Sequence, residues 1–192
     1  MKKIIAFALA FIFVLAGCQS DLPSSGDSFS GFEGYTQELT QDELENAMKS
    51  GKVELENRPD ENICYVSITC KTALASGELS DSMLSVLPED GVILDSFEFE
   101  YEDGATVFDV FAGVVRENKI HMEYTGTKTV PYVEGVANLY EFDCGPLSGW
   151  MYQVNGWFPS FSMGQFDIEP GDHIEIIYTC DLGDDVGDNY GD

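Results

Sequence analysis

The sequence predicts an α+β domain in which one main amphipathic helix packs on a mixed β-sheet. Apolar and polar residues alternate along several short segments, as in strands that bury one face. Residues 107–115 instead repeat their apolar side chains at helical spacing. The pair Asn155-Gly156 follows an alternating segment and supplies the two positive-φ residues of a type I′ hairpin turn.

The chain begins with the features of a bacterial lipoprotein signal peptide. Lys2 and Lys3 precede eleven apolar residues, 4–14, and a lipobox that ends at Cys18. A transmembrane anchor is the alternative, but eleven residues at ~1.5 Å each fall short of the ~20 that span a bilayer. We therefore expect removal of residues 1–17, acylation of Cys18 and an extracytoplasmic location on a bacterial membrane.

The remaining chain divides into a tether, a short helix, one domain and a tail. Residues 18–39 are rich in Ser, Gly and Asp, as flexible tethers are. Residues 40–60 should form a short helix and a linker, because Thr40 and Glu43 match a capping box. The narrow apolar stripe of this helix predicts that it packs weakly or not at all. The folded domain is expected over residues 61–182 and an acidic tail over residues 183–192.

Alternation and turn residues predict the elements of the domain. Thr106, with Asp109 three residues later, should cap the main helix, which ends near Asn118. Residues 169–172, Glu-Pro-Gly-Asp, predict a type II turn. Residues 71–94 show no clear period and are expected to form a long loop, with a helical turn near Ser82. The predicted strands are residues 63–70, 96–102, 120–124, 139–142, 148–154 and 173–180.

The composition is strongly acidic. The chain has 35 acidic and 9 basic residues, a formal charge of −26, which becomes −28 once residues 1–17 and their two lysines are removed. Such a chain repels phosphates and anionic lipid headgroups, so we expect no nucleic-acid partner. The aspartates near the C-terminus could offer oxygens to calcium, but they lack the spacing of a helix-loop-helix calcium loop. We therefore expect a solvated tail and no metal site.

Four cysteines remain once Cys18 is assigned to lipid, and an even number in an exported chain predicts two disulfides. A zinc site is the alternative, but no pair has Cys-x-x-Cys spacing. Cys64 and Cys70 share one face of a predicted strand, about 20 Å apart at ~3.3 Å per residue, whereas a disulfide needs Cα atoms within ~7 Å. Each of these two should therefore pair with Cys144 or Cys180.

Signals of catalysis are nearly absent. The sequence has no Gly-x-Ser-x-Gly elbow, no phosphate-binding glycine loop and no His-Glu-x-x-His pair, so we expect no enzyme and no catalytic residues. Trp157 and Phe158 lie just past the predicted hairpin tip. Either they form an exposed contact surface, or the 71–94 loop covers them.

One run of motifs resembles a known family. Residues 149–156, Gly-Trp-Met-Tyr-Gln-Val-Asn-Gly, are followed by Gly164, Phe166 and residues 170–179. This order is similar to the C-terminal domain of the transcobalamin and intrinsic factor family and to its bacterial lipoprotein relatives, over about residues 90 to 182. The resemblance implies a β-grasp-like sheet with its first and last strands parallel and adjacent. It also implies a corrinoid (cobalamin-like) ligand, facing Gln153, Asn155, Trp157, Phe158 and Gly164.

The implied parallel pairing also suggests how the cysteines pair. It would place Val66, Ile68 and Cys70 beside Ile176, Tyr178 and Cys180. The expected disulfides are then Cys70 with Cys180 and Cys64 with Cys144.

Two functions follow from these observations. The first is a membrane-anchored extracytoplasmic binding module, with a corrinoid as the implied ligand. The second is a cell-surface interaction or adhesion module that uses the same fold for a protein or glycan partner. Fold alone does not choose between them.

The lipid anchor can be tested directly. A Cys18→Ala chain should no longer associate with membranes, because no other residue of the lipobox carries acyl chains. Fractionation before and after a high-salt wash measures this. A variant that stays with the membrane after the wash would show a different kind of tether.

Overall fold

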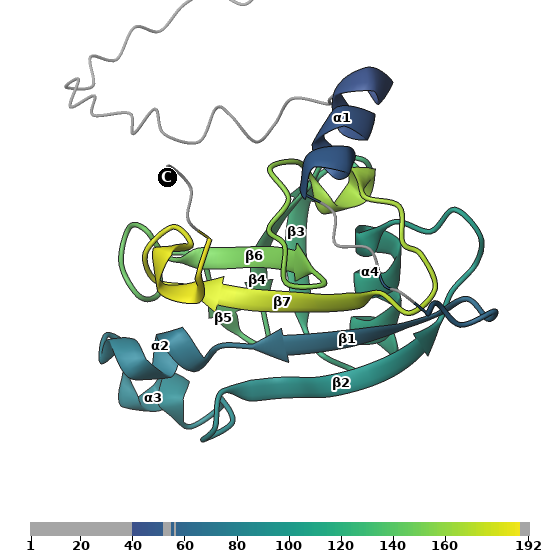
Figure 1. The fold of residues 1–192 in the computed structure, drawn as a ribbon. Coiled ribbons are helices and arrows are strands. Elements are labelled where there is room, and N and C mark those ends of the chain that lie inside the picture. The colour runs from purple at the N-terminus through teal and green to yellow at the C-terminus, as the bar shows by residue number, and fades with distance from the viewer. Residues whose placement is uncertain (1–39, 52–54, 56, 189–192) are drawn as a thin grey trace, which may run out of the picture. The chain divides into compact units, whose positions relative to one another are not determined.

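The computed structural model describes residues 40–51, 55 and 57–188, so the predicted signal peptide, tether and last four residues lie outside the described part (Figure 1). The main sheet has four strands, in the order β2-β1-β7-β6. They are β1 (Ile63–Thr69), β2 (Val92–Glu100), β6 (Gly149–Val154) and β7 (His173–Thr179). The central strands β1 and β7 are parallel, and the flanking pairs are antiparallel. The predicted adjacency of the first and last strands of the domain is thus confirmed.

Helix α4 (Val107–Glu117) covers one face of this sheet, behind the main sheet in Figure 1. Thr106 and Asp109 form the predicted capping box, in which each backbone N–H donates to the other's side chain. Seven residues of α4 are buried, and they pack against inward side chains of β1 and β7 such as Val66 and Ile176. The apolar residues that repeat at helical spacing therefore form the side of α4 that faces the core. The predicted α+β class is confirmed.

A second, smaller sheet completes the domain. It has the order β3-β4-β5, with β3 (Met122–Gly126), β4 (Pro131–Val136) and β5 (Leu139–Tyr140). The sequence did not predict β4. The 71–94 region was also predicted incompletely, because it contains α2 (Lys71–Ser76) and the start of β2 as well as α3 (Asp81–Leu84), the expected turn near Ser82.

The two ends of the described chain are more ordered than the sequence indicated. Helix α1 (Gln41–Gly51) begins at the predicted capping box, and its Leu44 is half-buried against the main core. At the other end, Asp184–Val186 forms a 3-10 turn. Asp185 accepts hydrogen bonds from the hydroxyl of Thr179 and the backbone N–H of Cys180. The first residues of the expected solvated tail thus contact the end of β7.

The register between β1 and β7 differs from the expected one by two residues. Val66 lies opposite Ile174 and Ile68 opposite Ile176, rather than Ile176 and Tyr178. Strand β7 starts at the residue after the 169–172 turn, where Tyr65 N–H donates to the carbonyl of Asp172 at 2.9 Å. This contact fixes the pairing at the start of β7, so the end of β1 does not reach the level of Cys180.

Both predicted disulfides are wrong. Cys64, Cys70, Cys144 and Cys180 are all free thiols. Cys64 lies in the core under α4, whereas the other three lie in or against a separate apolar cluster around Leu139 and Tyr178. The expected partners Cys64 and Cys144 therefore belong to different parts of the core, and the shifted register separates Cys70 from Cys180.

Burial makes these thiols poor acids. It raises the pKa of Cys64 to about 12, with a further contribution from the Asp172 carboxylate, and that of Cys70 to about 11. The pKa of Cys180 rises to about 12, through burial and the neighbouring Cys144. Because thiolate is the reactive form, these three thiols should be nearly inert in the folded protein near neutral pH.

This predicts a specific alkylation pattern. At pH 8, iodoacetamide should label Cys64, Cys70 and Cys180 very slowly in the folded chain, because each thiol ionises well above that pH. In urea without reductant, Cys144 and these three should all react within minutes. Peptide mapping measures the labelling. A pair that reacts in urea only after a reductant is added would reveal a disulfide and contradict the free-thiol structure.

Candidate functional site

The predicted turn at residues 169–172 forms at the entry to β7. The N–H of Asp172 donates to the carbonyl of Glu169 at 3.1 Å, and Gly171 has a φ of 83°. Proline fixes φ at the second position of a type II turn, and glycine accepts the positive φ of the third. The turn delivers the side chain of Asp172 into the interior, where it is fully buried.

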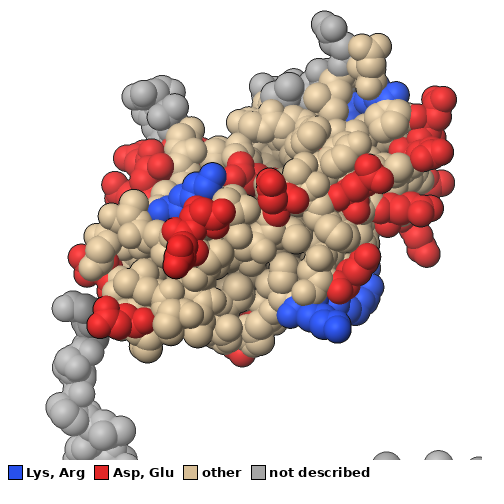
Figure 2. All heavy atoms as spheres, turned by 90° about the horizontal axis from the view of Figure 1, so that it is seen from below, with Lys and Arg blue, Asp and Glu red and all other residues tan. Residues whose placement is uncertain are grey.

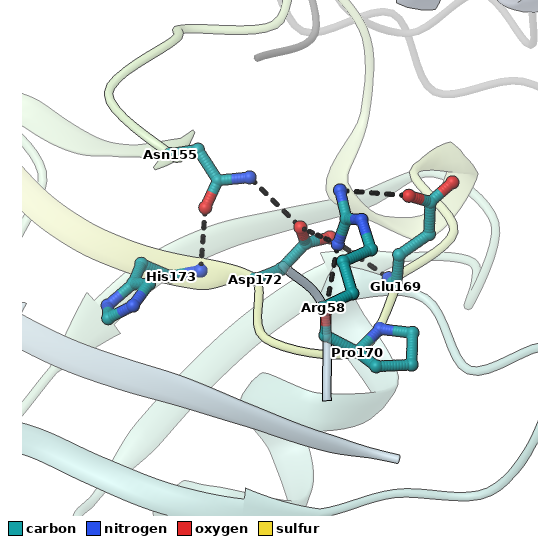
Figure 3. A network of polar contacts seen from close by, with 6 residues as sticks. All are labelled: Arg58, Asn155, Glu169, Pro170, Asp172 and His173. Carbon is teal, nitrogen blue, oxygen red and sulfur yellow. Dashed lines mark hydrogen bonds and ion pairs between the residues drawn. The ribbon is translucent and has the colours of Figure 1, made fainter. Parts of the chain in front are cut away.

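Asp172 is the centre of a polar network (Figure 3). Its Oδ1 accepts hydrogen bonds from the guanidinium of Arg58 at 2.8 Å and from Nδ2 of Asn155 at 2.9 Å. Its Oδ2 accepts from the N–H of Glu169 at 2.9 Å. Arg58 also donates to the carbonyl of Pro170 at 2.8 Å and pairs with the Glu169 carboxylate at 2.9 Å. A buried carboxylate is tolerated when it is paired and hydrogen-bonded, and here both conditions are met.

Asn155 connects this network to the hairpin. Asn155 and Gly156 have φ values of 53° and 83°, and residues 154 and 157 exchange two backbone hydrogen bonds, as in the predicted type I′ turn. The Oδ1 of Asn155 accepts from the N–H of His173 at 2.9 Å, and its own N–H donates to the His173 carbonyl at 2.8 Å. The two ends of the side-chain amide are therefore bonded to Asp172, in the turn, and to His173, the first residue of β7.

The outer face of the main sheet, turned away from α4, carries an aromatic stack. Tyr65 of β1 and His173 of β7 are opposite each other in the parallel register, with ring centroids 4.8 Å apart and planes inclined by 22°. A hollow of 150 Å³ lies against the stack and is also lined by Ser67, Ser96, Gln153, Gly156, Ile174 and Glu175. A second hollow of 510 Å³, lined by linker residues such as Arg58 and Pro59, also borders both rings. We call Tyr65, Ser67, Ser96, Gln153, His173 and Glu175 the sheet-face site.

Polar side chains of this site are held in fixed positions. Glu175 accepts hydrogen bonds from Nε2 of Gln153 at 2.5 Å and from the hydroxyl of Thr69 at 3.2 Å. Ser96 has a φ of 36° at a β-bulge, where β2 has one residue more than β1 between the pairs 66–97 and 68–94. Bulges re-aim side chains, and strained backbone is concentrated at functional sites. The bulge brings Ser96 to the rim of the smaller hollow.

The structure separates the five residues that the resemblance implied as ligand contacts. Gln153 lines the smaller hollow, whereas Asn155 belongs to the Asp172 network. Gly164 lies in a 3-10 turn against the carbonyls of Lys128 and Thr129. Phe158 is half-buried in the loop after the hairpin. The role of the five residues as ligand contacts stays a prediction.

Trp157 packs inward rather than forming an exposed patch. Its ring lies 6.1 Å from that of Phe161 and 6.2 Å from that of Phe166, measured between centroids. The backbone of Gly51, the last residue of α1, also lies so close to the indole that a Cβ there would overlap it. The indole is therefore covered by its own loop and by α1, not by the 71–94 region.

Of the residues in the sheet-face site, only Gln153 was among the ligand contacts expected from the sequence. Alternation places Tyr65, Ser67 and His173 on the outer side of their strands, but their proximity depends on the register of β1 and β7. Arg58 lies in the linker that follows α1, and no motif in the residues around it indicates its role. Among the described residues, no group of three or more His, Cys, Asp or Glu side chains is arranged to hold a metal ion. In the same part of the chain, no helix has the length and apolarity to cross a membrane.

The chain is similar to one described family and to solved structures. Residues 104–179 match a family described as a domain of unknown function (DUF4430). Haptocorrin in complex with Cbi is similar at 12% identity and a TM-score of 0.45, over 66% of this chain and 27% of the haptocorrin chain. A protein from Ruminococcus gnavus ATCC 29149, described as a candidate metal-binding protein, is similar at 16% identity and a TM-score of 0.37, over 62% of this chain and 97% of that one. No curated protein matches.

The packing of Trp157 predicts a structural role for this residue. Trp157→Ser should lower the free energy of unfolding by about 2 to 4 kcal/mol, because it removes a large ring from the Phe161–Phe166 cluster. Phe158 lies outside that cluster, so Phe158→Ser should lower the free energy of unfolding by roughly 1 kcal/mol. Urea denaturation followed by circular dichroism measures both. Equal losses in the two variants would show that Trp157 does not contribute to the core.

Proposed function

We propose that this chain is a lipid-anchored extracytoplasmic binding module, without catalytic activity, whose working surface is the sheet-face site. The observation that supports this best is the Tyr65–His173 stack between two hollows, with hydrogen-bonding side chains at its edge. Aromatic faces provide contact area at a low entropic cost, and neighbouring polar groups fix the orientation of a ligand. Both kinds of group are present on one rigid sheet.

The charge of the surface narrows the ligand class. Acidic side chains lie in many places on the face seen in Figure 2, and basic ones in few. Among the described residues, those that line the smaller hollow are neutral or acidic apart from His173, and none is Lys or Arg. A phosphorylated or carboxylated ligand would be repelled there, whereas a neutral or cationic ligand rich in amides or hydroxyls would not. Gln153, Ser67 and Ser96 can exchange hydrogen bonds with such groups.

A corrinoid is the ligand to test first. The rim of a corrin ring carries uncharged amide groups, which suit the amide and hydroxyls of the site, and the hairpin motif resembles that of corrinoid carriers. Cobinamide lacks the phosphate of cobalamin, so it should suit this acidic surface better. A hollow of 150 Å³ can take only an edge of the ring. Because little of the ligand is desolvated, this chain alone should bind it weakly.

A surface module for a glycan or protein is the second candidate. The same stack favours it, since a sugar ring can lie on Tyr65 while Ser67 and Ser96 bond to its hydroxyls. Such a module would need no small-molecule ligand. Binding measurements with corrinoids separate the two proposals.

The test is equilibrium dialysis of the chain without residues 1–18. Cobinamide should bind with a Kd of about 0.1 to 1 mM and cobalamin more weakly, in keeping with the small contact area. Tyr65→Ala and Gln153→Ala should each abolish detectable binding. Tyr124→Ala, which alters an exposed ring of the smaller sheet, should not. Absence of binding at millimolar cobinamide would reject the corrinoid and leave the glycan or protein partner.

A further inference from the structure

The hairpin tip carries the residue pair in which asparagine is chemically least stable. In an Asn-Gly pair, the backbone nitrogen of glycine can attack the side-chain carbonyl carbon of asparagine without hindrance from a side chain on the second residue. Asn155-Gly156 is such a pair. By contrast, Asn138, which also has a positive φ of 66° in the tight turn between β4 and β5, is followed by Leu139.

The fold restrains the side chain of Asn155 at both ends. Its Nδ2 donates to Asp172 and its Oδ1 accepts from His173, each at 2.9 Å (Figure 3). Attack on its Cγ requires the side chain to leave both partners and turn toward the nitrogen of Gly156. Arg58 donates to the same Oδ1 of Asp172 at 2.8 Å and keeps that carboxylate in place, so release of Asn155 is coupled to the integrity of the whole network.

We propose that Asn155 is a modification site, at which opening of the Asp172 network permits spontaneous deamidation and the product prevents the network from closing again. The Gly156 nitrogen forms a bond to Cγ of Asn155, and the Cγ–Nδ2 bond breaks. Ammonia leaves with the proton of the Gly156 N–H, and a cyclic imide remains. Water then opens the imide to aspartate or isoaspartate. The step consumes one water and needs no oxidant or cofactor.

The product is incompatible with the network as it stands. A carboxylate at position 155 would place an oxygen where Nδ2 now donates to Oδ1 of Asp172, 2.9 Å away. Two acceptors, both negatively charged, would then face each other in a site that already holds the Glu169 carboxylate beside Arg58. Loss of a donor to a buried carboxylate leaves that group partly unsatisfied. Isoaspartate would in addition lengthen the backbone of a two-residue turn.

The consequence reaches the sheet-face site. Gln153 and Gly156 flank the modified residue in the hairpin and line the smaller hollow. His173, whose N–H bonds to Asn155, carries one ring of the aromatic stack. Deamidation should therefore displace residues that line the smaller hollow, and the change is irreversible in each modified molecule.

The rate of deamidation tests the protection by the fold. The purified full chain is incubated at pH 8, folded or in urea, and peptide mapping by mass spectrometry follows the gain of about 1 Da at Asn155. The folded chain should react at least about tenfold more slowly than the chain in urea, because reaction needs local opening. The folded Arg58→Gln chain should react faster than the folded unmodified sequence, at a rate close to that of the chain in urea. Asn138 is the internal control and should remain unmodified under all these conditions.

Equal rates at Asn155 in the folded chain and in urea would overturn the proposal. A folded Arg58→Gln chain that reacts no faster than the unmodified sequence would also overturn it, because the network would then give no protection. If that variant fails to fold, the comparison between the folded and urea-denatured chain remains decisive.

The effect of the product is measured with two substitutions. Asn155→Asp reproduces the aspartate, whereas Asn155→Gly removes the side-chain bonds, adds no charge and accepts the positive φ. In urea denaturation, the unfolding constant of Asn155→Asp should exceed that of Asn155→Gly by roughly tenfold, because only the former adds a charge beside Asp172. An Asn155→Asp chain as stable as Asn155→Gly would show that the product fits the network.

Discussion

The structure depends on the pairing of one buried carboxylate with one arginine. Asp172 has no exposed surface, and it joins the linker, the turn before β7 and the hairpin after β6 through Arg58, Glu169 and Asn155. A buried charge lowers the stability of the fold unless each of its oxygens is hydrogen-bonded. The network therefore stabilises the fold only when all of its hydrogen bonds are formed. It also fixes where β7 starts, and therefore which residues of β1 and β7 face each other across the centre of the sheet.

The sequence predicted those features that are encoded by local chemistry. Asn155-Gly156 and Pro170-Gly171 fix backbone angles without help from the rest of the chain, and both turns formed as expected. Helix α4 was equally clear because its apolar residues repeat at one spacing over three turns. The main-sheet strands were found by alternation, except that β2 continues through the bulge at Ser96, where alternation stops.

Features that depend on distant residues were not predictable in the same way. Alternation shows which face of a strand is buried, but a shift of two residues keeps every side chain on its face. Alternation therefore cannot distinguish two registers of β1 and β7 that differ by two residues. The cysteine pairing relied on this register and was wrong. The candidate site has the same origin, because Tyr65 and His173 are 108 positions apart and meet only in the correct register. Arg58 has no pattern around it, and its role is visible only beside Asp172.

The parallel pairing of β1 and β7 also determines the order in which the domain can be completed. Among the described elements, β1 and β7 are the first and last strands, so contacts between residues far apart in the sequence must form before the sheet has its middle. Closing contacts so far apart in sequence is slow compared with forming a hairpin. A chain that is made or exported from its N-terminus holds β1 and β2 without their central neighbour until residue 179 has emerged. Until then, the edge of β1 that pairs with β7 can form hydrogen bonds with other chains. The domain therefore depends on rapid pairing of β7, its last strand.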